Sequence, residues 1–254
     1  MTRLIAAEFR KLFTTRLWLW ILLLSLVWTA AYCALTIEFG NNRPGLAPPL
    51  AGAAGQHALF AIAAGGAGPL AAILAAIGVT GEFRHKTVAT TFLATPRRDR
   101  VVTAKLITYL LVGAAYAVVC IAVSLAITLP WLSDEGIHVS LAWHDNLAVL
   151  TAVVASTAIF SMAGAGLGAL IGAQLATVTG LLIYLYVVEP LLSHISALHS
   201  WTAYLPGVAA DGLTQATQVG VQLLSPWAGG AVFAVWAVAL AIAGALRTLR
   251  RDIT

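Results

Sequence analysis

The chain has 254 residues, of which 60% are hydrophobic and only 9% are charged. A soluble domain carries about 25% charged residues, so 14 Lys and Arg with 10 Asp and Glu are too few to cover a water-soluble globule. The mean hydropathy of +0.91 indicates that lipid is the solvent. The net charge of +4 must therefore be located along the chain before it is taken as a sign of nucleic-acid binding.

Six uncharged apolar segments are candidates to cross the bilayer core, which needs about 20 helical residues. The fifth is shorter than this and requires Glu189 and Pro190 to lie near its outer end. The sequence therefore predicts an all-α integral membrane protein forming one transmembrane domain over residues 1–254. Its predicted spans are residues 17–37, 58–80, 106–131, 147–172, 175–188 and 228–246.

The basic residues fall on alternate sides of these spans, as the positive-inside rule requires when both termini are cytoplasmic. Arg43 alone is predicted outside, whereas the other 13 Lys and Arg lie on the inner side. The outer segments collect Glu38, Asp134, Glu135, Asp145, Glu189 and Asp211. The basic excess is thus a topology signal, and no nucleic-acid partner is expected.

The N-terminal segment, residues 1–16, has the pattern of an amphipathic helix. Ile5, Phe9 and Leu12 lie on one helical face, whereas Arg10 and Lys11 lie on the other. Such a helix lies in the headgroup plane with its basic residues toward anionic lipid. The alternative is a simple cytoplasmic extension of the first span.

Residues 81–105 form the only long cytoplasmic connection. Phe83, Val88, Phe92 and Leu93 make an apolar stripe among charged and hydroxylated residues, and Pro96 ends that helical pattern. A plain solvated loop would not need the stripe, so we expect it to contact a partner.

Two further features concern packing and the outer side. Gly164, Gly168 and Gly172 recur every four residues on one face of the fourth span, which favours close helix packing within the chain over a subunit interface. Glu189 and Pro190 suit the start of a short outer helix, with the carboxylate as its cap; a direct role of Glu189 in cargo or proton movement is the alternative.

The sequence lacks the motifs of the common catalytic sites. No lysine follows a glycine, so a P-loop is excluded, and neither His-Glu-x-x-His nor Gly-x-Ser-x-Gly occurs. The outer histidines have no helical ligand spacing, so no metal site is predicted. We therefore expect a chain that is not an enzyme and holds no cofactor of its own.

The loop residues resemble a known family. An amphipathic helix, two spans, Gly-Glu-Phe-Arg-His-Lys-Thr at 81–87, Thr-Phe-Leu-Ala-Thr-Pro-Arg-Arg-Asp-Arg at 91–100 and four further spans resemble the permease subunit of ATP-binding-cassette (ABC) type-2 transporters, particularly short actinobacterial ones. Val-Val-Glu-Pro-Leu-Leu at 187–192 and Tyr-Leu-Pro-Gly at 204–207 extend the similarity over the whole chain. The connection at 172–174 departs from the family because it has no charge.

The resemblance implies a type V exporter architecture in a bacterial cell membrane. It implies an elbow helix at 2–16, a coupling helix within 82–95 and short extracellular re-entrant helices within 193–227. The expected partners are a separate ABC ATPase that binds ATP and Mg, and a second permease subunit in a homodimer or heterodimer. The residues expected to couple to the ATPase are Glu82, Phe83, Arg84, Thr87, Phe92, Leu93, Thr95, Pro96 and Arg97.

Two other function classes stay open on the sequence alone. A stand-alone secondary transporter or channel would be expected to carry charged residues at mid-depth of the spans, and none lies there. An intramembrane enzyme is the third hypothesis. The genomic neighbourhood discriminates, because an adjacent P-loop protein favours the exporter subunit.

Overall fold

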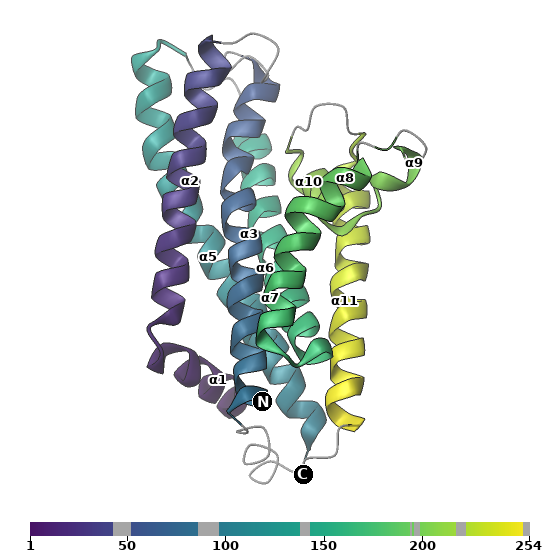
Figure 1. Cartoon of the computed structure of the whole chain (residues 1–254). Coiled ribbons are helices and arrows are strands. Elements are labelled where there is room, and N and C mark those ends of the chain that lie inside the picture. Colours follow the sequence, from purple (N-terminus) through teal and green to yellow (C-terminus); the bar gives the residue numbers. More distant parts are fainter. Residues whose placement is uncertain are drawn as a thin grey trace.

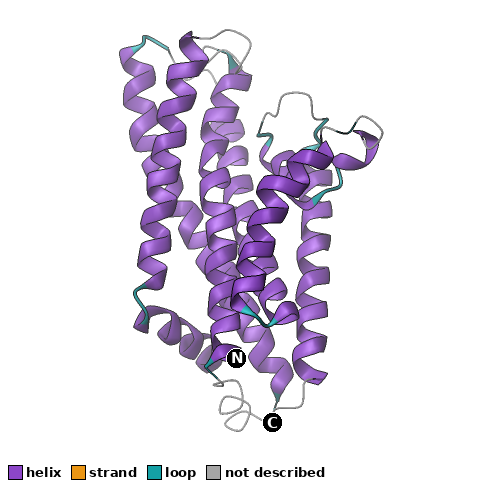
Figure 2. Cartoon of the chain, viewed as in Figure 1, coloured by secondary structure: helices purple, strands orange, loops and turns teal. Residues whose placement is uncertain are grey.

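The computed structural model describes residues 1–42, 52–85, 97–137, 143–193, 195, 199–216 and 222–250. Every regular element in this part of the chain is helical (Figure 2). The elements are α1 (Thr2–Thr14), α2 (Leu17–Asn42), α3 (Ala53–Arg84), α5 (Arg98–Asp134), α6 (Trp143–Ile171), α7 (Gln174–Ile183), η1 (Tyr184–Val188), α8 (Glu189–Ser193), α9 (His199–Thr202), α10 (Pro206–Thr214) and α11 (Pro226–Arg250).

The prediction of six spans is confirmed. The helical stretches long and apolar enough to cross a membrane are Leu17–Glu38, Gly55–Arg84, Arg98–Asp134, Asp145–Ile171, Gln174–Ser193 and Pro226–Leu249. They stand side by side as a bundle, and α1 lies obliquely at the foot of α2 (Figure 1). The described part of the chain is therefore that of a multi-pass membrane protein.

Two predicted boundaries differ from the structure. The connection predicted over residues 81–105 is shorter, because α3 continues to Arg84 and α5 begins at Arg98. The fifth span is longer than residues 175–188, because the helix continues through Pro190 to Ser193. Pro190 follows the π-helical turn η1, so the chain already departs from ordinary α-helical hydrogen bonding where the proline enters.

The alternating directions of the spans bring the described basic side chains to one end of the bundle. This basic end holds α1, the last turn of α3, the first turns of α5 and the end of α11 (Figure 1). The opposite, acidic end holds Glu38, Asp134, Glu135, Asp145, Glu189 and Asp211 together with α8, α9 and α10. The charge separation predicted from the sequence is thus present in the fold.

Helix α6 is at the centre of the bundle and packs against α3, α5 and α11. Gly164 and Gly168 face α3, where a Cβ on Gly164 would lie 2.6 Å from the Ala72 Cα and one on Gly168 would lie 3.0 Å from the Ala76 carbonyl oxygen. The close approach that the glycine repeat predicted therefore lies within the chain.

The third glycine of the repeat has a different role. Gly172 follows the last residue of α6 and has a φ of +75°, a left-handed conformation that glycine adopts without strain. It ends the helix and does not extend the packing stripe. Gly166, on another face of α6, meets α11, where a Cβ would lie 2.6 Å from the Ala241 nitrogen.

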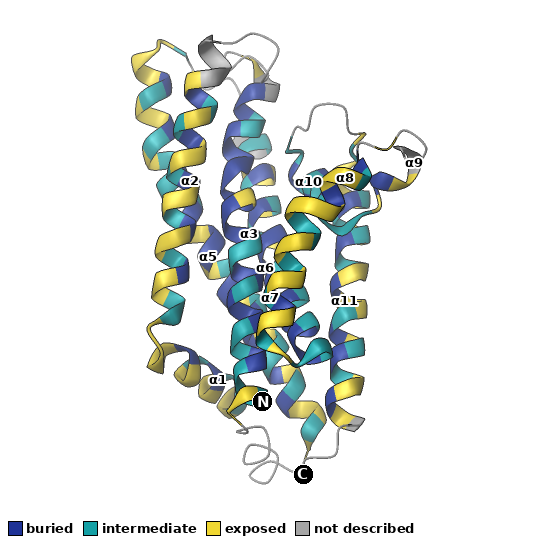
Figure 3. Ribbon diagram, viewed as in Figure 1, coloured by how far each residue is buried: buried dark blue, intermediate teal, exposed yellow. Residues whose placement is uncertain are grey.

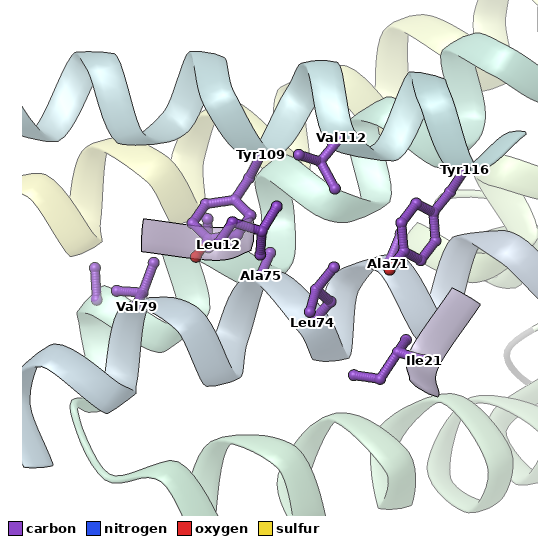
Figure 4. Close-up of a cluster of buried hydrophobic side chains, with 11 residues drawn as sticks. Leu12, Ile21, Ala71, Leu74, Ala75, Val79, Tyr109, Val112 and Tyr116 are labelled. Atoms are coloured by element: carbon purple, nitrogen blue, oxygen red, sulfur yellow. The ribbon is translucent and has the colours of Figure 1, made fainter. Parts of the chain in front are cut away.

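Apolar side chains lie both inside the bundle and on its outer surface. The main core joins α1, α2, α3, α5 and α6, and Figure 4 shows Tyr109 reaching across Ala75 and Val79 beside Leu12. Outside, α2 and α7 carry many exposed positions (Figure 3), among them Trp20 at 68% and Leu175 at 81%. A soluble protein does not expose such continuous apolar faces, whereas lipid covers them without cost.

Candidate functional site

Charged residues mark two candidate sites, a group of four at one end of the bundle and the single buried Glu189 at the other. The first is at the basic end, where α1 packs against α3 and α5. It comprises Glu8 and Lys11 of α1, Glu82 of α3 and Lys105 of α5. We call these four residues the ionic ring, because each charge contacts both of its opposite charges.

The geometry of the ionic ring is closed. Lys105 Nζ donates to Glu8 Oε2 at 2.5 Å and to Glu82 Oε1 at 2.8 Å. Lys11 Nζ donates to Glu8 Oε1 at 2.7 Å and to Glu82 Oε1 at 2.9 Å. Two positive and two negative charges thus alternate, and the ring as a whole is neutral.

Burial differs around the ring. The side chains of Glu8, Lys105 and Glu82 are 7%, 12% and 14% exposed, whereas that of Lys11 is 44% exposed. Burial lowers the pKa of Lys11, but the hydrogen bond to Glu8 and the charge of Glu82 outweigh it, so its pKa lies above the ordinary 10.5. Removing one partner of a buried ion pair costs about 3–5 kcal/mol, because the remaining charge is left without compensation.

A small cavity adjoins the ring between α3, α5, α6 and α11. Glu82 and Lys105 line it together with mainly apolar side chains and Thr248. Its volume of about 30 Å³ has room for about two water molecules. It is therefore a water-sized space beside the ring.

The structure describes part of the predicted ATPase-coupling set. Glu82 lies in the ring, and Phe83 turns inward, half-buried against the main core. Arg84 Nη1 donates to Gln174 Oε1 of α7 at 3.4 Å, and Arg97 is exposed directly before α5. Thr87, Phe92, Leu93, Thr95 and Pro96 lie outside the described residues. Of the two phenylalanines predicted to contact the ATPase, Phe83 thus packs against the core of this chain.

The sequence reading did not single out Glu8, Lys11 and Lys105 as a site. A signal was present for Glu8, which lies four residues before Leu12 and hence on the buried face of an amphipathic helix. Lys105 directly precedes the predicted third span, where a charge needs a partner or water. Their pairing depends on where α1 lies, and the sequence does not give that.

The second site lies at the acidic end, where α8 meets α10. Glu189, the first residue of α8, is 4% exposed, and its Oε1 accepts a hydrogen bond from the Val208 N–H at 2.7 Å. Val208 is in the first turn of α10, which begins at Pro206. Glu189 therefore caps α10. The sequence predicted that it would cap the short helix directly after it; the cap lies on α10 because the chain turns back through α9.

The other carboxylate oxygen lies against Gly207. A Cβ at Gly207 would stand 2.7 Å from Glu189 Oε2, so a side chain at this position would displace the carboxyl. Oε2 is itself buried and has no hydrogen-bond partner in the described part of the chain. Burying an ionised carboxylate costs several kcal/mol, and a helix dipole offsets at most about 2 kcal/mol of that.

The backbone before Glu189 is unusual. Over Tyr184–Val188 the chain forms a π-helix, η1, and the Glu189 N–H donates to the Tyr184 carbonyl five residues back. Pro190 has no N–H to continue the ordinary α-helical register. Single π turns of this kind occur frequently at functional sites.

Among the described residues, no group of three or more His, Cys, Asp or Glu side chains is placed to hold a metal ion. Comparisons with protein-family models, curated proteins and solved structures found no match.

Proposed function

We propose that this chain is the membrane-spanning permease subunit of an ATP-driven exporter of the ABC type-2 class. The observation that carries the proposal is the ionic ring. It joins α1, the end of α3 and the start of α5 at the place where the connection between α3 and α5 leaves the bundle. A force applied to that connection is thus passed to two spans and the N-terminal helix together.

The orientation follows from the positive-inside rule, which places the basic end in the cytoplasm. Both termini are then cytoplasmic, α8 is the outer end of the fifth span, and α9 and α10 lie at the extracellular side in the place of the re-entrant helices. Helix α1 acts as the elbow helix at the inner surface, where its exposed Arg3 and Arg10 meet anionic lipid. The membrane is the bacterial cell membrane.

In this function the partner ATPase binds ATP and Mg and docks on the connection near residues 82–97. Closure of the ATPase moves that connection, and the helices fastened to it reorient. Arg98 Nη1 donates to the Leu249 carbonyl of α11 at 3.5 Å, which extends the fastened unit to the last span. In this function the translocation path is formed together with a second permease subunit.

A stand-alone secondary transporter is the second candidate function. The observation that favours it is Glu189, a buried acid within a span, because such groups often carry protons or ions in transporters. An ATPase partner is what distinguishes the two functions.

The test is to purify the tagged chain from membranes of its own source cells and identify bound proteins by mass spectrometry. We expect a P-loop ATPase, ATP hydrolysis only when that subunit is present, and loss of the ATPase in Phe92→Asp, which places a charge in the predicted contact. Phe13→Asp is the matched control, because Phe13 is 56% exposed and belongs to α1, outside the segment predicted to contact the ATPase. Proton-driven transport by the purified chain alone would contradict the proposal.

A further inference from the structure

The capped carboxyl at the acidic end has a property that capping does not explain. A cap needs one acceptor, and Glu189 Oε1 supplies it to Val208. Oε2 is equally enclosed but has no hydrogen-bond partner in the described residues. A glutamine, whose amide oxygen also accepts a hydrogen bond, would cap the helix without burying an ionisable oxygen.

The space around Oε2 limits what can bind there. The carboxyl packs against Gly207, where an added Cβ would lie 2.7 Å from Oε2. In the described part of the chain, no ion pair joins Glu189 to a Lys, Arg or His. A proton is therefore the ligand that fits without rearrangement, and it also removes the uncompensated charge.

We propose that Glu189 is a proton-binding site that latches α10 onto the fifth span. With a proton on Oε2, the neutral acid caps α10 and stays buried. When α10 undocks, the carboxyl enters water and releases that proton, and redocking takes one proton up again. The proposal does not rest on an ATPase partner, because it concerns only contacts within this chain.

The structure explains how a single group can control α10. The helix also packs through apolar contacts, with Ala209 and Ala210 buried against Phe233 of α11. Hydrogen bonds from Gln215 Nε2 to the Leu224 carbonyl and from Trp236 Nε1 to the Tyr204 carbonyl flank it. On its other side, Glu189 is the polar contact that ties its first turn to α8. Undocking therefore exposes Glu189 together with the buried face of α10.

Other titratable groups near the latch must be distinguished from Glu189. Tyr184 of η1 is close enough to interact electrostatically with it. The neighbouring elements also carry Tyr204, Asp211 of α10 and Asp145 of α6, whereas the side chains of His194 and His199 lie outside the described residues. Tyr184→Phe and Asp211→Asn serve as controls that each remove one of these groups.

The test measures the reactivity of a buried cysteine on α10. Cys33 and Cys120 are first replaced by alanine, and Ala210, which is 3% exposed, is replaced by cysteine. Its rate of modification by a water-soluble maleimide is divided by that of Ser225→Cys at each pH, because Ser225 is exposed. The ratio cancels the ordinary pH dependence of thiol chemistry and reports the opening of α10.

Because undocking of α10 releases one proton, the dependence of the relative modification rate on pH has a defined slope. Above the pH range in which a water-exposed glutamate ionises, the relative rate should rise about tenfold per pH unit. In Glu189→Gln, which mimics the neutral acid, the rate should stay low at all pH values. In Gly207→Ala the added Cβ should give a high, pH-independent rate, whereas Gly180→Ala, with nothing near its Cβ, should behave as the parent chain.

An infrared measurement keeps the proposal testable if Gly207→Ala fails to insert. At a pH where α10 is docked, the parent chain should show the C=O stretch of a protonated carboxylic acid, and Glu189→Gln should lose it. A rate that is flat with pH in the parent, a slope that survives Glu189→Gln, or absence of the protonated band would each overturn the proposal. A slope that survives Tyr184→Phe and Asp211→Asn supports it.

Discussion

Replacement of Lys105 by methionine should destabilise the protein more than any other single change in the ionic ring. The Lys105 ammonium is 12% exposed and is hydrogen-bonded to both Glu8 and Glu82. Methionine keeps the apolar stem but leaves two buried carboxylates facing a single, half-exposed Lys11. The expected loss is about 3–5 kcal/mol of unfolding free energy, the cost of an uncompensated buried charge.

Lys11→Met is the matched control. Lys11 contacts the same two carboxylates but is 44% exposed, and Lys105 stays in place to compensate them. Its expected cost is about 1 kcal/mol or less, the usual value for an exposed ion pair. The two variants remove the same charge, so their difference measures burial.

The assay is unfolding of the purified chain in mixed micelles with increasing SDS, followed by tryptophan fluorescence. The combined variant Glu8→Gln, Glu82→Gln and Lys105→Met should recover most of the loss, because neutral side chains leave no buried charge behind. Equal effects of Lys105→Met and Lys11→Met, or no recovery in the combined variant, would refute the reasoning.

Three further predictions follow from particular residues. Gly164→Ala should destabilise the chain by about 1–3 kcal/mol, because the added Cβ overlaps α3. Gly65→Ala, whose Cβ meets nothing within 4 Å, should be neutral or stabilising. Unfolding of both variants in SDS measures the difference. Single cysteines at Asp134 and Arg98 should react from opposite sides of sealed cells, Asp134 from outside; external labelling at Arg98 would contradict the orientation. Because the pKa of Lys11 is raised on folding, its contribution should be complete below pH 10.5 and disappear as pH rises through its folded pKa, so that the Lys11→Met difference in stability vanishes there.

The spans and the charge asymmetry were predictable from the sequence because each depends on one segment at a time. A helix of about 20 apolar residues partitions into lipid whatever its neighbours are, and Leu17–Glu38 and Pro226–Leu249 meet that condition unaided. The alternation of Lys and Arg between connections follows from the same segments. The Glu-Pro pair at 189–190 also predicted that the Glu189 carboxylate caps a helix.

The choice of partners was decided only by the tertiary structure. Glu8 pairs with Lys105, 97 residues away, and Glu189 caps a helix through a residue 19 positions later. Which donor each carboxylate oxygen meets depends on the rotation of each helix about its axis and on the path of the turn through α9. The hydropathy of a segment determines neither of these. The same holds for Gly164 and Gly172, which share a sequence spacing but serve helix packing and helix termination respectively. Segment hydropathy determines which helices enter the membrane, whereas their mutual packing determines which polar groups are buried together.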